Sequence, residues 1–324
     1  MRAVMGIKGL LLAVNDTFQR KHLREFANKT AAIDGYAWLH KGCFTCAKQL
    51  ACGERTDAYV KYFVKRLDQL LHFQVQPYVV FDGGYLPSKA GEEKERAESR
   101  RIKMEKGFAY LQSGDSNKAQ KYFSGAVDIT PEMAYRVILE LKKRNIKYVV
   151  APYEADAQMA FLCKAKLADF VISEDSDCIP YGCPNVLFKL DPTGFGDAYT
   201  RRDLVACKLN FTNWTQSNII DMCILCGCDY LENIKKVGIT TAHKLVSRYK
   251  STDRVLRALH FEGSLTVPKN YEKKFARAKL TFKHHIVFDP RSRTCTFVLL
   301  VLSQSTLLYF HTHTHTHTFH RHSS

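Results

Sequence analysis

Seven acidic residues are spaced so that they could share one site. The pairs Glu154-x-Asp156 and Asp175-x-Asp177 would each let two carboxylates from one loop or helix start reach the same region. Two carboxylates 4 Å apart repel each other by roughly 4 kcal/mol at an effective dielectric constant near 20. Several on one edge would therefore have raised pKa values or bind cations, and cations are the simpler solution. The seven candidate metal ligands are Asp34, Asp82, Glu154, Asp156, Asp175, Asp177 and Asp229.

The chemistry of such a site follows from its ligands. Oxygen ligands without accompanying Cys or His favour Mg²⁺ or Mn²⁺ over zinc. Two such ions about 3.5–4 Å apart can activate a water molecule and stabilise the leaving oxygen of a phosphodiester. We therefore predict a pair of Mg²⁺ ions, for which Mn²⁺ may substitute, and phosphodiester hydrolysis. An acidic loop residue taken alone is usually a solvated surface charge. The prediction therefore depends on the seven acids lying close together in the fold.

The elements that must position these acids are four short runs of β-branched and aromatic residues. Residues 30–33, 78–81, 148–150 and 170–172 each lead into one or two of the acids. Helix-compatible segments such as 57–71 and 131–144 separate them, which predicts an α/β fold with a central, mostly parallel sheet flanked by helices. Sites in such sheets form outside the carboxyl ends of the strands. A separate helical region after residue 212 would contribute Asp229 to the site.

Composition narrows the class of partner. The 324 residues are 46% hydrophobic, enough for one large domain or two small ones. Lys and Arg outnumber Asp and Glu by 48 to 32, and the formal charge of +16 suggests nucleic acid or a membrane surface as partner. No run of about 18 apolar residues and no signal-peptide layout is present, so we expect no membrane association. Hydrolysis of nucleic acid accounts for both the acids and the basic charge.

Cysteine usage points to a reduced interior. Most of the eleven Cys lie in apolar stretches, such as residues 222–226, and are expected to be core thiols. The pairs Cys43/Cys46 and Cys223/Cys226 have zinc-like spacing but lack a second pair at finger-like distance. We expect neither a disulfide framework nor structural zinc.

Several strings resemble one known family. Residues 5–10 (MGIKGL), 80–83 (VFDG), 151–158 (APYEADAQ), 173–177 (SEDSD) and 227–230 (GCDY) are similar to the flap endonuclease and xeroderma pigmentosum G superfamily of 5′ nucleases. Residues 38–42 and 86–89, with no longer insert in the charged helix that follows, resemble its exonuclease 1 branch more than flap endonuclease. The resemblance runs from Met5 to about Arg293. It implies a PIN-like nuclease core with a helical arch and a helix-two-turn-helix.

The resemblance also assigns roles. It makes the seven acids metal ligands or near-ligands and places the charged stretch after Pro87 in an arch over the active site. Lys89 and Arg96 are implied to be catalytic residues that clamp the scissile phosphate, with Arg100 one turn beyond as a DNA contact. The seven-residue separation puts the first two on nearly the same helical face. The mixture of Glu and Lys, read alone, would predict a solvated charged helix.

The choice of DNA end is assigned to two residues near Asp34. Tyr36 and His40 match positions where the family stacks on the terminal or penultimate base. Stacking contributes about 1–3 kcal/mol per base and tolerates any sequence. The alternative is a core tyrosine and a histidine with ordinary hydrogen bonds. In relatives a Gly directly after the initial Met, here Gly6, lies close to the active site.

The hairpin around residues 237–239 resembles the family's helix-two-turn-helix, which holds K⁺ on backbone carbonyls and grips duplex phosphates. Backbone amides at a helix N-terminus suit phosphate independently of the resemblance. Relatives often have Ser at the position of Cys226, so side-chain ligation of K⁺ is in doubt there and carbonyl ligation is not. The assigned DNA contacts are Gly238, Ile239, Thr240 and Lys244, and the assigned K⁺ positions are Cys226, Asn233 and Val237.

The predicted organisation has six parts. Residues 1–4 would be an alternative-start extension before Met5. The nuclease region 5–103 includes the start of the arch, 104–129 continue it, 130–230 form the internal nuclease region and 231–293 the helix-two-turn-helix. Residues 294–324 would be an aberrant, disordered tail. The alternating His-Thr of residues 311–318 is what a CA repeat encodes, which favours translated non-coding sequence over a His-rich metal-binding tract.

The resemblance implies a structure-specific 5′-to-3′ exonuclease on double-stranded DNA with 5′ flap endonuclease activity, acting in mismatch repair, recombination and end resection in the nucleus. DNA with 5′ ends, nicks, gaps or flaps would be the partner. Mismatch-repair proteins bind relatives through a C-terminal extension that we do not expect here, and no nuclear-import signal is evident. The alternatives are a flap endonuclease of replication and a truncated, non-catalytic DNA-binding product.

Overall fold

A seven-stranded sheet forms the centre of the computed structural model, which describes residues 6–261 and 266–298. The strand order is β1-β7-β6-β5-β2-β3-β4. The five strands from β6 to β4 pair in parallel, whereas β7 and β1 add antiparallel pairs at one edge. The predicted mostly parallel sheet flanked by helices is confirmed. The strands are β1 (Gln19–His22), β2 (Thr30–Asp34), β3 (Gln76–Phe81), β4 (Lys147–Val150), β5 (Phe170–Ser173), β6 (Asn185–Phe188) and β7 (Phe195–Thr200).

Both faces of the sheet are covered. Ala31, Ile33 and Val79 belong to a core cluster with α2 (Gly35–Phe44), α4 (Ala58–His72) and α7 (Pro131–Lys143). Ala32 and Val80 face the opposite cluster, which includes α8 (Ala155–Lys164) and α9 (Gln216–Cys226). Alternate strand residues point to opposite faces, so burial on both faces requires nearly continuous apolar strands. This is why β2, β3 and β5 stood out in the sequence.

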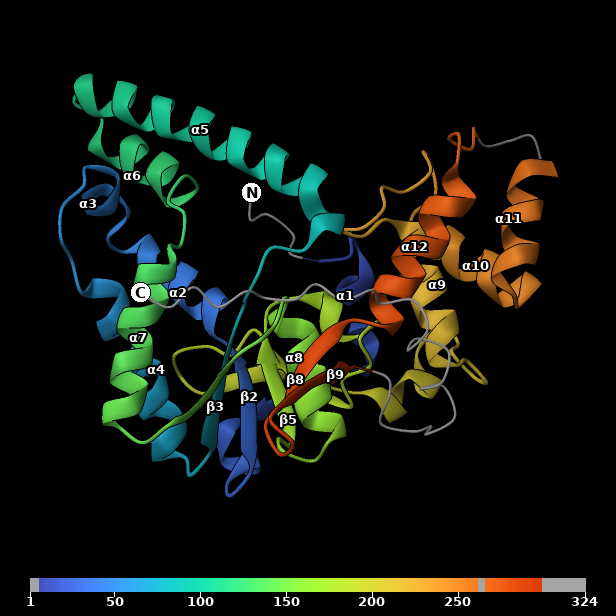
Figure 1. Cartoon of the computed structure of the whole chain (residues 1–324), viewed down its shortest axis with the longest axis horizontal. Helices are drawn as coiled ribbons and strands as arrows, with labels where there is room; N and C mark the ends of the chain where they lie inside the picture. Colours follow the sequence, from blue (N-terminus) through green and yellow to red (C-terminus); the bar gives the residue numbers. More distant parts are fainter. Residues whose placement is uncertain (1–5, 262–265, 299–324) are drawn as a thin grey trace, which may run out of the picture.

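A helical pair lies apart from the sheet. Helix α5 (Ala90–Gln112) runs along the top of the view in Figure 1, with α6 (Ser116–Ser124) beneath it. As its charged sequence predicts, α5 is mostly exposed, and Gly107 is its buried residue. A Cβ atom at Gly107 would lie 2.5 Å from the ring of Phe123, so the missing side chain lets α6 pack closely.

The C-terminal part adds three helices and a small sheet. Helices α10 (Ile239–Tyr249), α11 (Thr252–Phe261) and α12 (Tyr271–Lys283) follow α9 at the right of Figure 1. Strands β8 (Ile286–Asp289) and β9 (Thr294–Phe297) pair antiparallel, and the Gln158 side chain of α8 makes two 2.8 Å hydrogen bonds to the backbone of Phe288. The remaining short elements are α1 (Leu10–Ala13), α3 (Ala47–Ala51), η1 (Asn15–Thr17), η2 (Leu23–Phe26), η3 (Pro87–Lys89), η4 (Ser176–Cys178) and η5 (Arg201–Ala206).

The predicted tail boundary at residue 294 is wrong for its first five residues. Residues 294–297 form β9, and buried Val298 donates its backbone N–H to the carbonyl of His285 at 2.9 Å. The lack of charge in this segment was interpreted as a lack of fold, whereas the segment pairs with β8. Residues 299–324 and 1–5, including the candidate start Met5, lie outside the described residues. None of the helices within the described ranges combines the length and the apolar composition of a membrane span.

Candidate active site

The ends of the parallel strands bring the predicted acids together. Asp34 is the last residue of β2, and Asp82 follows β3 directly. After β4, Glu154 precedes α8, whose first turn holds Asp156. Asp175 and Asp177 follow β5, while Asp229 lies in the turn after α9, as expected from the sequence.

Electrostatic coupling shows how close the first of these acids are. Burial raises the pKa of Asp34 to about 7, and the charge of Asp82 adds to the increase. Burial likewise raises the pKa of Asp82 to about 6, with a further contribution from Glu154. Removal from water and mutual repulsion both disfavour the charged carboxylates. These groups therefore need protons or cations.

The remaining acids extend the same cluster. Burial raises the pKa values of Asp156, Asp175 and Asp177. Among the further causes are Asp175 acting on both of the others, and Asp229 acting on Asp175 and Asp177. The seven acids thus form one electrostatically connected site.

Backbone hydrogen bonds fix three of these carboxylates. Oδ1 of Asp34 accepts from the N–H of Ala37 at 2.9 Å, which also caps α2, and Oδ1 of Asp82 accepts from Ala155 at 2.7 Å. Oδ1 of Asp175 accepts from the Asp177 N–H at 2.9 Å. By contrast, the buried Oδ1 of Asp177 has no hydrogen-bond partner among the described residues. An unpartnered carboxylate oxygen among other buried acids fits a divalent cation, which would satisfy it.

The ammonium group of Lys89 is the cation that these acids hold in the structure. Its Nζ lies 2.7 Å from Oδ2 of Asp229 and contacts Oε1 of Glu154. Although burial disfavours its charged form, these two carboxylates raise the pKa of Lys89. Within the described ranges, no three Asp, Glu, His or Cys side chains already form a ready-made set of metal ligands. The acids converge as predicted, but a metal ion at Glu154 and Asp229 would share them with, or displace, this ammonium.

Arg96 also reaches the cluster, together with a residue that the sequence analysis missed. Its Nη2 pairs with Glu92 one turn earlier in α5 and lies 3.6 Å from Oδ2 of Asp229. Burial raises the pKa of Glu92 to about 7, and the charge of Asp229 contributes. The i,i+4 spacing of Glu92 and Arg96 is visible in the sequence, but such pairs are common on solvated helices.

Three further missed residues surround Glu154. Its Oε2 accepts hydrogen bonds from the hydroxyls of Tyr181, at 2.9 Å, and Tyr230. His285 Nδ1 lies 3.2 Å from the Tyr181 hydroxyl. Tyr230 lies within a recognised string, but Tyr181 and His285 are 27 and 131 residues from Glu154, and no local pattern connects them.

The start of the described chain covers one side of the site. Gly6 has a φ of 75°, and a Cβ atom there would overlap Oδ1 of Asp175 and lie 2.6 Å from Oδ1 of Asp177. The N–H of Ile7 donates to the buried Ser176 hydroxyl at 2.7 Å. Only glycine fits this close approach, as the resemblance implied for Gly6.

The residues predicted to recognise a DNA end share a neighbourhood. Tyr36 is half-buried and His40 is exposed, on the same face of α2. The charge of Asp128 acts on both, and Asp128 lies 3.4 Å from Arg100 of α5. Arg100 also pairs with Glu93 at 2.6 Å. The structure therefore brings Tyr36, His40 and Arg100 together between α2 and the arch helix.

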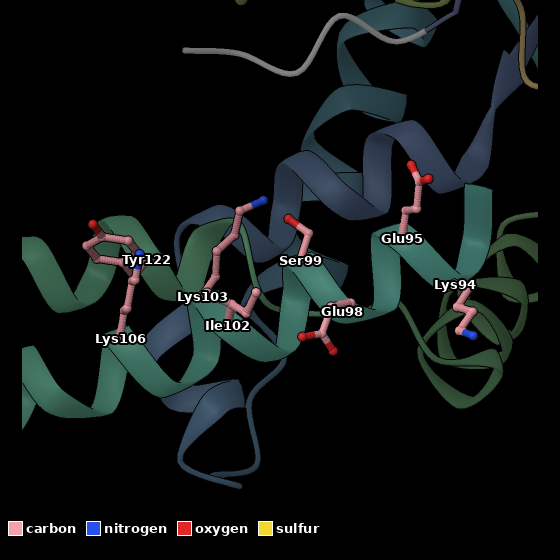
Figure 2. Close-up of a pocket in the computed structure, with 8 residues that line it drawn as sticks. All are labelled: Lys94, Glu95, Glu98, Ser99, Ile102, Lys103, Lys106 and Tyr122. Carbon is pink, nitrogen blue, oxygen red and sulfur yellow. The ribbon is translucent and has the colours of Figure 1, made fainter. Parts of the chain in front are cut away.

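An open groove of about 630 Å³ follows α5. The side chains of Glu95, Ser99 and Lys103 succeed one another along one edge of the helix (Figure 2), and Lys106 and Tyr122 lie at the α6 end. Because charges of both signs line it, this groove does not by itself define a phosphate site.

The predicted hairpin lies between α9 and α10. Gly238 is the N-cap of α10 without a side-chain cap, so amides of the first turn remain for a ligand. Gly238, Thr240 and Lys244 are exposed, whereas Ile239 is half-buried.

The three positions assigned to K⁺ lie in or beside the same turn. Asn233 donates from Nδ2 to the carbonyl of Val237 at 2.9 Å. The thiol of Cys226 donates to the carbonyl of Lys8 at 3.3 Å, so it is engaged elsewhere. Gly227, with a φ of 98°, brings the backbone close to Asn233.

Comparison with known proteins agrees with this geometry. Residues 5–103 match the XPG N-terminal domain and residues 145–229 the XPG I-region. The chain is 42% identical over 289 residues to exonuclease 1 of Arabidopsis thaliana, covering 89% of this chain and 39% of that protein. It is 36% identical over 294 residues to the DNA damage-inducible protein DIN7 of Saccharomyces cerevisiae, covering 90% and 68%. The catalytic core of Rad2 in complex with DNA substrate has a similar fold, with a TM-score of 0.66, 17% identity and 90% of each chain covered.

The strand order, the acidic cluster and the two domain matches define the PIN-like fold of the XPG nucleases. The chain belongs to the XPG nuclease family, in its exonuclease 1 branch. Nucleases of this type are generally metal-dependent. The chain spans about two fifths of the length of the Arabidopsis relative and 36% of exonuclease 1 of Danio rerio.

Proposed function

We propose that the protein is a Mg²⁺-dependent, structure-specific 5′-to-3′ exonuclease on double-stranded DNA that also cleaves 5′ flaps. The observation that carries this proposal is the cluster of seven acids at the carboxyl edge of the sheet, with Lys89 and Arg96 of the arch beside Asp229. Relatives named exonuclease 1 support the class of reaction.

The acids would hold two metal ions, which supply an activated water and stabilise the leaving oxygen. Asp34, Asp82 and Asp175 keep one oxygen tied to the backbone, so their orientation is fixed before a metal ion binds. Asp177 contributes a buried oxygen that has no other partner among the described residues. Lys89 and Arg96 carry the positive charges nearest to the acids and would orient the scissile phosphate.

DNA would be recognised at two places. Tyr36 and His40 would stack on the exposed base at a 5′ end, with Arg100 on the adjoining phosphate. The amides of residues 238–240 and the ammonium of Lys244 would bind duplex phosphates, and K⁺ on carbonyls around Cys226, Asn233 and Val237 would stiffen that turn. Both sites would have to engage one duplex, which selects ends, nicks, gaps and flaps.

We propose roles in mismatch repair, recombination and end resection and a nuclear location, as the family resemblance implies; a relative named DNA damage-inducible supports a role in DNA repair. We propose mismatch-repair proteins as partners only of the relatives, whose chains are longer.

The decisive experiment uses a 5′-labelled blunt duplex and a 5′ flap with Mg²⁺. We expect stepwise loss of 5′ nucleotides from the duplex and cleavage at the flap base. Asp177→Ala and Asp82→Ala should abolish both reactions while DNA binding persists, whereas Glu132→Gln, an exposed acid in α7, should behave as wild type. Flap cleavage without duplex degradation would identify a flap endonuclease, and unchanged turnover in Asp177→Ala would exclude the metal assignment.

A further inference from the structure

The two carboxylate oxygens of Glu154 have different partners. Oε1 contacts the ammonium of Lys89, the cation that stands in the acidic cluster. Oε2 accepts hydrogen bonds from the hydroxyls of Tyr181, at 2.9 Å, and Tyr230. Two donors saturate Oε2 and fix the plane of the carboxylate. Oε1 is therefore the oxygen that remains for a cation.

Tyr181 is itself held by two further side chains, Tyr230 and His285, and Nδ1 of His285 also lies 3.7 Å from Oε2 of Glu154. The Tyr181 hydroxyl lies 2.5 Å from that of Tyr230 and 3.2 Å from Nδ1 of His285. Tyr181 and His285 are only 2% and 3% exposed, and their rings meet edge to face with centroids 5.5 Å apart. Neither side chain can turn away to water, so the geometry of the hydroxyl is set by its neighbours.

The contacts of the two tyrosine hydroxyls show what His285 contributes. The two hydroxyls take part in four close contacts but carry only two protons. Nδ1 of His285 lies 3.2 Å from the Tyr181 hydroxyl, so a proton on Nδ1 would be donated to that hydroxyl and leave the hydroxyl's own proton for Glu154 or Tyr230. The buried Nε2, which has no partner among the described residues, is then a bare acceptor and not an unsatisfied N–H.

We propose that Tyr181, oriented by His285, is a positioning residue for metal binding, which makes Glu154 present Oε1 alone to a divalent cation. The inference rests on the proposed function, because it assumes a divalent cation at the acidic cluster. Residues that orient metal ligands by hydrogen bonds typically change metal affinity by about 10–100-fold when they are replaced. Tyr181 touches neither DNA nor a reacting atom in this role.

The chain offers a matched control for removal of one hydroxyl. Tyr271 in α12 is also 2% exposed, and its hydroxyl has no hydrogen-bond partner among the described residues. Tyr181→Phe should weaken the binding of Mn²⁺ to the DNA-free protein by about tenfold or more, whereas Tyr271→Phe should leave it unchanged. Binding is measured from the electron paramagnetic resonance signal of free Mn²⁺, and circular dichroism melts check that each variant is folded.

Two more measurements separate positioning from a general structural role. The Mg²⁺ concentration for half-maximal cleavage should rise in Tyr181→Phe by the same factor as the Mn²⁺ dissociation constant, with kcat at saturating Mg²⁺ largely kept. His285→Leu should also weaken Mn²⁺ binding. The double variant should bind no more weakly than Tyr181→Phe alone, because His285 acts through the Tyr181 hydroxyl.

The outcomes are distinguishable. If wild type binds Mn²⁺ and degrades DNA but Tyr181→Phe binds Mn²⁺ equally well, the positioning role is overturned and the nuclease proposal stands. If the losses in Tyr181→Phe and His285→Leu add, the connection through the hydroxyl is overturned. If the wild-type chain binds no Mn²⁺ and cleaves no DNA, both proposals fail together.

Discussion

At the scale of single residues, the site depends on how closely the backbone approaches the acids. Gly6 lies against Asp175 and Asp177 with a positive φ, so any side chain there both strains the backbone and overlaps a carboxylate. The position was noticed in the sequence only through the family resemblance. Its physical reason, contact across about 170 residues of chain, becomes visible only in the structure.

Gly6→Ala should therefore reduce kcat by about 100-fold or more, since a displacement near 1 Å at a catalytic group can have that effect. Affinity for duplex DNA should change little, because the hairpin at residues 237–239 is untouched. Single-turnover cleavage and a DNA-binding titration measure the two effects. Gly91→Ala is the control, because a Cβ atom there meets nothing within 4 Å. Equal loss of activity in both variants would contradict the steric explanation.

Buried carboxylates with raised pKa values also predict how stability depends on pH. Asp34, at about 7, and Asp82, at about 6, bind protons in the folded state at pH values where unfolded aspartates, near 3.9, do not. The folded protein without metal ions should therefore lose stability as pH rises from about 4 to 7. Metal ions bind the deprotonated acids, so the stabilisation by Mg²⁺ should grow over the same range.

Thermal melts in EDTA and in Mg²⁺ at pH 5, 6, 7 and 8 test this expectation. The melting temperature in EDTA should fall across the series, and the increase caused by Mg²⁺ should be largest at pH 8. Asp34→Asn should flatten the dependence in EDTA. A melting temperature in EDTA that rises with pH would contradict the raised pKa values of Asp34 and Asp82 in the folded protein.

At the scale of elements, the sequence predicted those parts of the fold whose burial leaves a local pattern. Strands β2 and β5 are buried on both faces and are continuously apolar, and α7 begins at Thr130-Pro131, which is a helix-start signal. Strand β1 was not predicted, because Gln19–His22 is polar, as an edge strand can be. Strand β9 was not predicted, because its pairing with β8 leaves no local pattern in the sequence.

The arch also shows that a sequence pattern predicts local features better than contacts between distant residues. Lys89 and Arg96 were predicted to lie at the acids and do so, but the Glu92 side chain between them was interpreted as solvated. In the structure Glu92 pairs with Arg96, so it would compete with a DNA phosphate for this guanidinium. Glu92→Gln should release Arg96 and lower the KM for a 5′-recessed duplex by up to about fivefold, since a surface ion pair contributes at most about 1 kcal/mol.

Glu105→Gln is a control for Glu92→Gln, because Glu105 also forms an ion pair four residues apart, in the reverse order, with Arg101 further along α5. Its KM should stay at the wild-type value in the same steady-state assay. A rise in KM for Glu92→Gln would show that Glu92 orients Arg96 toward the phosphate and does not compete with it.

At the scale of the whole molecule, two separate surfaces must hold one duplex. In the proposed function, the acids and the arch would contact the end, while the helix-two-turn-helix would contact phosphates further along. A net charge of +16 supplies long-range attraction, but attraction alone does not choose an end. Affinity and choice of end should therefore be separable by mutation, with Lys244 acting on the first and Tyr36 on the second.

Lys244→Ala should weaken binding to blunt, nicked and flapped duplexes by the same factor, because a phosphate contact carries no information about the end. It should also reduce the slope of log affinity against log salt by about one, the value for one released phosphate contact. Tyr36→Ala should instead weaken binding to substrates with a free 5′ end and keep the salt slope, since stacking releases no counterions. Fluorescence anisotropy from 50 to 200 mM salt measures both quantities, with Lys142→Ala, an exposed lysine on α7, as the control. Should Lys244→Ala discriminate between ends, the hairpin would take part in choosing the substrate, and the division between the two surfaces would have to be abandoned.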